Sequence, residues 1–205
     1  MTLKDFLKDK KICIIGAHPD DIELGLGATL NQIKYKDIRA SIFSGAMEIE
    51  GNEEISNELR ASMYSYGIWN WVVHMFDVRK FYQKTDLIRN DIFALYREYD
   101  VFFTHSKYSQ HSDHRIIGES VDDIIKDKTI ITWEEVHSGK NIPINMWNEV
   151  TAQDMAVKTR ALDCYKSQAK RPYFEGGHII DMARFRGNQI LKDYAEAFNL
   201  VRLVS

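Results

Sequence analysis

Apolar and polar positions follow two different periods along the chain. Short runs rich in apolar residues, typical of buried strands, stand at 12–16, 38–43, 71–76, 101–104 and 129–133. Between them lie longer segments in which apolar residues recur every three or four positions, as on one helix face. The helices are expected at 24–35, 53–66, 85–99, 113–126, 152–165 and 179–192.

Strands and helices therefore alternate along most of the chain. This order predicts parallel βαβ units and a doubly wound α/β fold, in which helices flank both faces of a mostly parallel sheet. No linker or repeat interrupts the pattern, so residues 1–205 are expected to form a single domain. Residues 200–204 fit either a last strand or the end of the chain.

The composition is that of an ordinary soluble globular protein, with 44% hydrophobic and 28% charged residues. A net charge of -3 gives no reason to expect a nucleic-acid partner, because such proteins favour basic patches. The chain has no run of about 20 apolar residues for a membrane helix, and its first residues lack the apolar stretch of a signal peptide. Cys13 and Cys164 do not suggest a disulfide framework. A cytoplasmic location is expected.

A dense group of titratable residues follows the first predicted strand. The segment directly after it contains His18, Asp20, Asp21 and Glu23. Such groups are costly to bury unless they are paired or bound to a metal, and the carboxyl ends of strands are where open α/β sheets bind ligands. Zinc accepts imidazole and carboxylate ligands. His18 and one of the two aspartates can supply two ligands, and the other aspartate can handle the proton of a bound water.

A second group follows the strand at 101–104. The spacing of His111, Asp113 and His114 puts one imidazole within reach of a metal and lets the other face a reacting carbonyl. Both groups follow strands, so both loops are expected at the same edge of the sheet. His105, which precedes this group, is not expected to contact the site.

Each group also has a purely structural interpretation. Asp20 and Asp21 can cap and begin the helix that follows them, and His111 and His114 can be surface residues at a helix start. The pairing of the two groups favours the functional interpretation. Gly25 and Gly27 lack the third glycine of a dinucleotide-binding loop and more simply allow close packing of the helix.

The two groups together resemble the PIG-L/LmbE-like family of zinc-dependent N-deacetylases. The resemblance rests on AHPDDIELGLGATL at 17–30 and HSDHR at 111–115, and the tail from Lys158 to Phe198 supports it. It implies a Rossmann-like fold, in agreement with the alternation of strands and helices. It also implies substrates that are mostly N-acetylated amino sugars.

The resemblance further assigns roles to individual residues. His18, Asp21 and His114 are implied as zinc ligands and Asp20 as the general base. His111 is implied as the group that stabilises the tetrahedral oxyanion, with Asp113 tuning it; a neighbouring carboxylate is expected to keep His111 charged.

Three residues are candidates for substrate contacts. Many family members carry a sugar-binding arginine early in the helix expected at 53–66, and here the nearest one, Arg60, stands about one turn late. In the tail, Arg186 is expected to hold an anionic part of the substrate at the pocket mouth, unless it only pairs on the surface. Tyr194 belongs to the same tail pattern.

The sequence thus predicts a zinc hydrolase that removes an acetyl group from an N-acetylated amino sugar or sugar conjugate. Two alternatives are a zinc amidase for a non-sugar N-acyl substrate and a non-catalytic Rossmann-like module that binds a sugar or nucleotide. Asp20 beside the ligands argues against the module, because a binding site needs no base. The sequence leaves the particular sugar and the oligomeric state, monomer or homo-oligomer, open.

Overall fold

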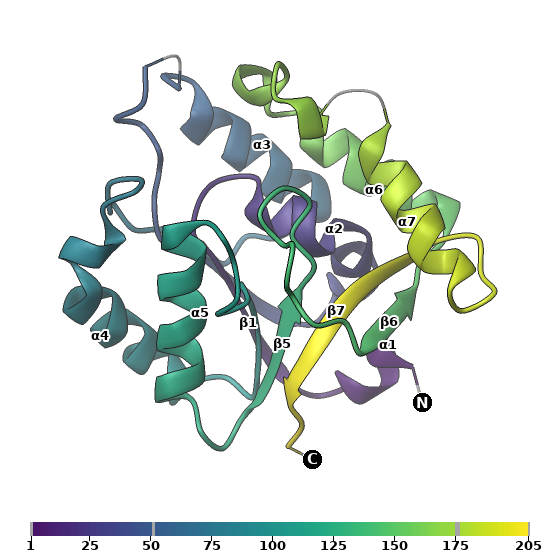
Figure 1. Cartoon of the computed structure of the whole chain (residues 1–205), viewed down its shortest axis with the longest axis horizontal. Helices are drawn as coiled ribbons and strands as arrows, with labels where there is room; N and C mark the ends of the chain where they lie inside the picture. The colour runs from purple at the N-terminus through teal and green to yellow at the C-terminus, as the bar shows by residue number, and fades with distance from the viewer. Residues whose placement is uncertain (1, 51, 175–176, 205) are drawn as a thin grey trace.

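A sheet of seven strands forms the centre of the protein, in the part of the chain that the structure describes (residues 2–50, 52–174 and 177–204). The structure is a computed structural model. The strands are β1 (Lys11–Gly16), β2 (Asp37–Ile42), β3 (Trp71–Val73), β4 (Val101–Thr104), β5 (Thr129–Trp133), β6 (Met146–Glu149) and β7 (Ala195–Arg202). Their order across the sheet is β3-β2-β1-β4-β5-β7-β6, and Figure 1 shows β7 beside β5.

The sheet is mostly parallel, as the sequence predicts. The five strands from β3 to β5 across the sheet are parallel, whereas β7 is antiparallel to both β5 and β6. The last strand begins at Ala195 and is longer than the sequence indicates. Strand β6 was not expected, because its four residues lack an apolar run and only one of them is buried.

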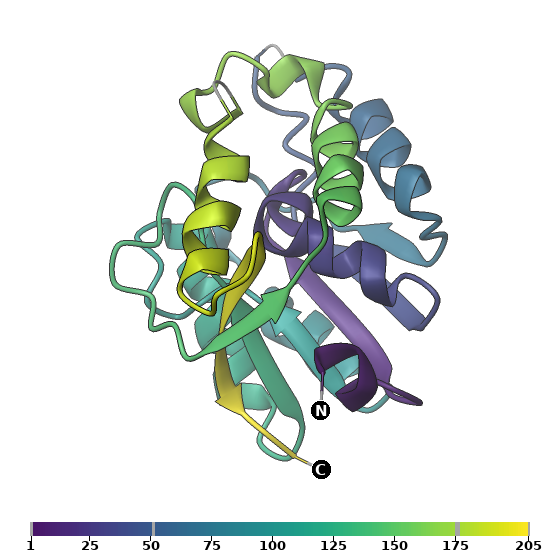
Figure 2. The same ribbon diagram turned by 90° about the vertical axis from the view of Figure 1, so that its right-hand side faces the viewer.

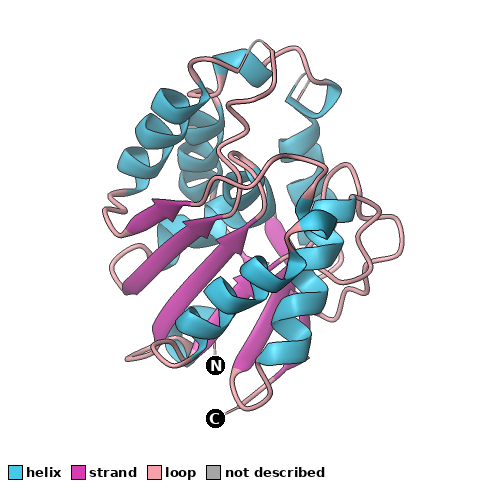
Figure 3. Cartoon of the chain, turned by 90° about the vertical axis from the view of Figure 1, so that its left-hand side faces the viewer, coloured by secondary structure: helices cyan, strands magenta, loops and turns pink. Residues whose placement is uncertain are grey.

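Helices cover both faces of this sheet. They are α1 (Leu3–Phe6), α2 (Asp21–Ile33), α3 (Ile55–Tyr66), α4 (Thr85–Tyr96), α5 (Ser112–Ile124), α6 (Ala152–Leu162) and α7 (His178–Asn188), with 3₁₀ turns η1 (Phe81–Gln83), η2 (Lys166–Gln168) and η3 (Pro172–Phe174). Figures 2 and 3 show the helical layers from opposite sides of the molecule. None of the described helices is long and apolar enough to cross a membrane.

Strand β1 shows why the sheet is covered twice. Ile12 and Ile14 belong to the apolar core that also contains residues of α2, α3 and α6. Cys13 and Ile15 belong to a second core, shared with α4 and α5. Because successive strand side chains point to opposite faces, the four consecutive apolar residues 12–15 of β1 need helices on both sides of the sheet. This confirms the doubly wound arrangement.

The order of the strands creates a binding crevice at one edge of the sheet. Strands β1 and β4 are neighbours, but the chain continues from β1 to β2 on one side and from β4 to β5 on the other. Ligands of open α/β sheets bind where the connections diverge in this way, outside the carboxyl ends of the strands. Ile15 pairs with Thr104 in the register, so the loops after β1 and β4 leave the sheet side by side.

Helix α2, which follows the first of these loops, is bent at Leu26 (φ -142°). The bend leaves backbone groups without hydrogen-bond partners inside the helix, and the side chains of a buried ion pair supply those partners. Lys158 Nζ donates to the Leu24 carbonyl (2.8 Å), and Glu196 accepts the N–H groups of Ala28 (3.1 Å) and Thr29 (2.7 Å). Lys158 and Glu196 are themselves 2.6 Å apart. The tail of the chain therefore fixes the helix that carries the first titratable group.

Candidate metal centre and active site

A tight turn at Asp20 brings the chain from β1 into α2. Asp20 has φ 79° and ψ -24°, in the left-handed region that is uncommon for a residue other than glycine. Asp21 is the first residue of α2, and the backbone N–H of His18 donates to Asp21 Oδ2 (2.7 Å). This bond folds the loop back on itself and places the His18 ring beside the Asp21 carboxylate.

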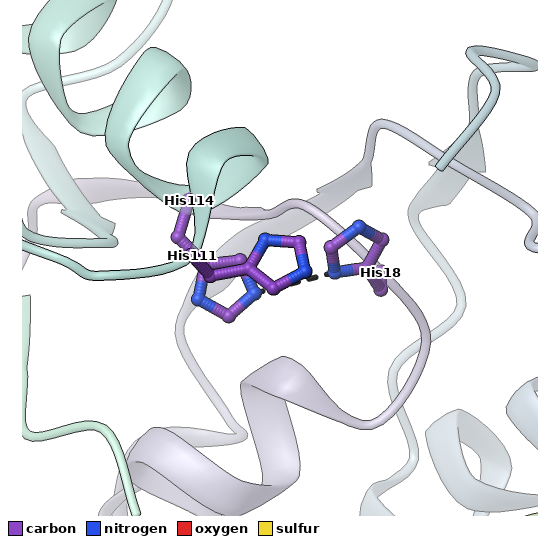
Figure 4. Close-up of side chains that lie close together, drawn as sticks. All are labelled: His18, His111 and His114. Atoms are coloured by element: carbon purple, nitrogen blue, oxygen red, sulfur yellow. Dashed lines mark hydrogen bonds between the residues drawn. The ribbon is translucent and has the colours of Figure 1, made fainter. Parts of the chain in front are cut away.

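The second group lies on the neighbouring loop and the start of α5. His111 caps this helix, because its Nδ1 accepts the N–H of Asp113 (3.3 Å). Asp113 and His114 stand in the first turn. Figure 4 shows the rings of His18, His111 and His114 gathered together, although His18 comes from the other loop. The structure therefore brings the two predicted groups into one site.

Three residues in this site, His18, Asp21 and His114, have side-chain atoms with the spacing of zinc ligands. His18 Nδ1 lies 3.2 Å from His114 Nε2 and 3.5 Å from Asp21 Oδ2, and His114 Nε2 lies 3.4 Å from Asp21 Oδ1. A tetrahedral zinc ion with bonds of about 2.0–2.1 Å keeps its ligand atoms roughly 3.3–3.4 Å apart. The donor set of two imidazoles and one carboxylate fits the same ion.

The tautomers of the two histidines also favour a cation between them. His18 Nε2 lies 3.0 Å from Asp113 Oδ2, and His114 Nδ1 lies 3.0 Å from Glu135 Oε2. Because a carboxylate only accepts hydrogen bonds, these nitrogens carry the protons of the neutral rings. His18 Nδ1 and His114 Nε2 face each other at 3.2 Å. Burial opposes a charge on His18, but its hydrogen bonds to Asp113 and Asp21 raise the pKa of His18 to about 9, so without a metal ion a proton on His18 joins the two nitrogens. A metal ion would take the place of this proton and accept both lone pairs, and carboxylates commonly orient metal-bound histidines in this way.

Glu135 and His105 are part of this arrangement, although the sequence analysis did not assign them to it. Glu135 binds His114 with one carboxylate oxygen and His105 Nδ1 (3.0 Å) with the other. Burial opposes its charge, but the hydrogen bonds from the two histidines hold the pKa of Glu135 well below its usual range. His105 follows β4 and Glu135 stands two residues after β5. Both therefore lie at the carboxyl end of a strand, where open α/β sheets bind ligands.

Two further sets of ligand atoms lie within 4.8 Å of one another, one from His18, His111 and His114 and one from Asp21, His105 and His114. His105 is less suited to hold a metal than His18. Its Nδ1 faces Glu135 (3.0 Å) and its Nε2 faces Asp21 Oδ2 (3.1 Å). Burial opposes a charge on this ring, but the two carboxylates raise the pKa of His105 to about 9. Both ring nitrogens therefore carry protons, and neither has a lone pair for an ion.

His111 lies beside the candidate metal position as a neutral ring. Burial, with the His114 and His18 rings next in effect, lowers the pKa of His111 to about 4. Since Nδ1 accepts the Asp113 N–H, the neutral ring carries its proton on Nε2, which is free to donate. The expectation of a charged His111 is corrected here. The Asp113 carboxylate bonds to His18 (3.0 Å) and to the backbone N–H of Arg79 (2.6 Å), and not to the His111 ring.

Asp20 has no hydrogen bond from its side chain to any described residue, and it does not cap α2. It is 7% exposed and lines the same cavity as the histidines. Burial, with the charges of Asp21 and Glu23 next, raises the pKa of Asp20 well above its usual value. A metal ion at His18 and His114 acts in the opposite direction and favours the ionised form. Asp20 is thus a free carboxylate beside the candidate metal position.

The cavity above these residues has a volume of about 440 Å³. His18, Asp20, Asp21, His111 and His114 line it together with residues from the loops after β2, β3 and β5 and from the segment around η3. This volume lies within the usual size of small-molecule sites, roughly 300–1,000 Å³.

The three residues expected to contact substrate do not line this cavity. Arg60 is exposed on α3. Arg186 is occupied by Glu134, to which it donates from Nε (2.8 Å) and Nη2. Tyr194 is half-buried, with the Arg184 guanidinium 5.8 Å from its ring centroid. The proposed substrate contacts of all three are therefore corrected, and Arg186 follows the surface-pairing alternative.

Comparisons with known proteins identify a family for this chain. The model of the PIG-L family, described as GlcNAc-PI de-N-acetylase, matches residues 13–125, which is more than half of the chain. Among curated proteins, the uncharacterized deacetylase YaiS of Escherichia coli (strain K12) is 27% identical over 173 residues, covering 78% of this chain and 92% of YaiS.

Solved structures share the fold at low sequence identity. The N,N'-diacetylchitobiose deacetylase from Pyrococcus horikoshii has a TM-score of 0.79 at 19% identity, covering 98% of this chain and 87% of that one. GalB, the 4-carboxy-2-hydroxymuconate hydratase from Pseudomonas putida KT2440, has a TM-score of 0.71 at 14% identity, covering 96% and 98%. A deacetylase and a hydratase share this fold, so the reaction has to be argued from the site.

The role of Glu135 can be tested through metal affinity. Glu135→Gln removes the carboxylate that fixes the His114 tautomer, and loss of such a partner typically weakens metal binding by about 10–100-fold. Titration against a chelator of known zinc affinity measures the change. Glu119→Gln, an exposed position on α5, is the matched control. Equal affinities of the two variants would show that Glu135 does not orient a metal ligand.

Proposed function

Because the chain belongs to the PIG-L (GlcNAc-PI de-N-acetylase) family, we propose that it is a zinc-dependent hydrolase that removes the acetyl group from an N-acetylated amino sugar or sugar conjugate. The observation that carries this proposal is the pair of facing nitrogens His18 Nδ1 and His114 Nε2, with the Asp21 carboxylate against both and the unpaired carboxylate of Asp20 in the same cavity. A binding module needs the first feature at most, whereas a hydrolase needs both.

His18, Asp21 and His114 would hold the zinc ion. When bound, zinc lowers the pKa of a water toward about 7 and polarises a carbonyl oxygen. Asp113 and Glu135 keep the two histidines in the tautomers that leave a lone pair for the ion. These five residues therefore supply the ion's site and orientation, and the proton transfers fall to Asp20 and His111.

Asp20 accepts a proton from the attacking water while the water oxygen forms a bond to the amide carbon. The neutral His111 ring donates from Nε2 to the oxyanion that forms, a contribution of the kind often worth about 3–4 kcal/mol per donor. The C–N bond then breaks while Asp20 returns the proton to the leaving nitrogen. The products are acetate and the free amine. The substrate is proposed to be a small molecule met in the cytoplasm, the location expected from the sequence.

A direct test is a screen of N-acetylated sugars and nucleotide sugars for released acetate, with metal analysis of the same sample. We expect acetate from at least one amino sugar and loss of the activity on chelation. Release of acid only from non-sugar N-acyl compounds would contradict the proposed substrate class. Hydrolysis that survives complete metal removal would contradict the proposed chemistry.

The base is tested by Asp20→Asn. An amide cannot accept the water proton, so turnover should fall by about 10²–10⁴-fold, while zinc content stays unchanged. Asparagine tolerates the left-handed conformation of this position, so folding should be kept. Asp9→Asn is the matched control, because Asp9 is exposed and has a similar positive φ of 61°. Loss of zinc with the activity would make Asp20 a ligand instead.

The neutral state of His111 gives a pH prediction. With a pKa near 4, the ring is neutral throughout the range above pH 5, and a bound cation lowers this pKa further. Its Nε2–H donor is then present at neutral and alkaline pH. His111→Ala should lower the rate by about 10²–10³-fold and His111→Gln less, with the alkaline limb of the pH–rate profile unchanged in both. An alkaline limb that disappears in the variants would instead show that a charged His111 is required.

A further inference from the structure

Two arginines line the mouth of the cavity, and most of its acidic groups already have partners. Arg79 comes from the loop after β3 and Arg171 from the segment before η3. Of the acidic residues around the cavity, Glu134 is paired with Arg186, Glu48 accepts the backbone N–H of Val78, and Glu135 binds His105 and His114. Glu134 and Glu135 are therefore paired with basic side chains, whereas Glu48 and Asp20 are not. Neither arginine forms an ion pair with a described residue, so both guanidinium groups can meet a ligand.

Arg79 is held in place by an unusual backbone. Its φ is 62°, in the left-handed region, where a residue other than glycine is strained. Two successive amides fix this turn, because Val78 N–H donates to Glu48 and Arg79 N–H donates to Asp113 Oδ2 (2.6 Å). Asp113 Oδ2 also binds His18 Nε2. The position of Arg79 is thus tied directly to the candidate metal ligand His18.

The side chain of Arg79 is free to act on a ligand. It is exposed, and no described residue forms a hydrogen bond or ion pair with its guanidinium. Arg171 is exposed as well, and the one hydrogen bond of its guanidinium to a described residue runs from Nη1 to Tyr173 Oη (2.9 Å). By contrast, Arg186 donates two hydrogen bonds to Glu134. A planar guanidinium fork suits phosphate and carboxylate groups, which it binds bidentately.

We propose that the cavity mouth is an anion subsite, in which Arg79, assisted by Arg171, binds a phosphate or carboxylate group carried by the N-acetylated substrate. This inference rests on the proposed function and narrows its substrate class to anionic amino-sugar derivatives. The strained turn fixes the backbone of Arg79 relative to His18 through Asp113. The length of one arginine side chain therefore limits how far the anionic group can lie from the candidate metal position.

The test uses Arg79→Asn with a matched pair of probes, N-acetylglucosamine and N-acetylglucosamine 6-phosphate. Asparagine removes the cation but suits a positive φ better than arginine, so thermal stability should be kept. We expect the KM for the phosphorylated sugar to rise by roughly 10–100-fold, as for lost hydrogen bonds to a charged group. The KM for the uncharged sugar should change less than about twofold. Arg160→Asn, exposed on α6 and outside the cavity lining, should change neither.

A binding measurement separates this inference from the proposed reaction. Calorimetry with glucosamine and glucosamine 6-phosphate needs no turnover, and the wild type should bind the phosphorylated amine more tightly, an advantage that Arg79→Asn removes. Equal binding of the two amines by the wild type, or an equal rise in KM for both sugars in Arg79→Asn, overturns the anion subsite even when acetate is released. A phosphate advantage that depends on Arg79 supports it even when neither probe is hydrolysed.

Discussion

The site depends on two nitrogen atoms that face each other across 3.2 Å, His18 Nδ1 and His114 Nε2. The carboxylates of Asp113 and Glu135 impose this orientation, because they accept hydrogen bonds from the opposite nitrogens of the two rings. Without a metal ion a proton on His18 joins the two facing nitrogens, and with one they become a pair of metal ligands. The carboxylates behind the histidines therefore matter as much as the histidines.

The fold delivers these groups from separate strands. His18 and Asp21 follow β1, His111, Asp113 and His114 follow β4, and Glu135 follows β5. Strands β1, β4 and β5 are neighbours in the sheet, so three loops converge at one edge. The buried pair Lys158–Glu196 supports this convergence, because it holds the bent helix that begins at Asp21.

The sequence predicts the fold and the cluster of titratable residues in the site, but not the residues that orient this cluster or surround it. Strands with apolar residues on both faces, such as β1, and the polar residues that follow them are local patterns, so both could be recognised. Glu135 could not be recognised from the sequence, because its partners, His105 and His114, lie 30 and 21 positions away. The pairing of arginines could not be predicted either. Only the fold shows that Arg186 is paired with Glu134 and that the guanidinium of Arg79 has no partner among the described residues.

X-ray absorption at the zinc edge of the purified protein tests the central claim most directly. The account predicts about one zinc ion per chain, bound by two imidazole nitrogens and by oxygen at roughly 2.0–2.1 Å. Both cysteines are free, and neither lines the cavity, so no sulfur ligand is expected. In a His18→Ala, His114→Ala variant the imidazole signal and the ion should disappear together. A sulfur ligand, or an unchanged spectrum and metal content in that variant, would contradict the account.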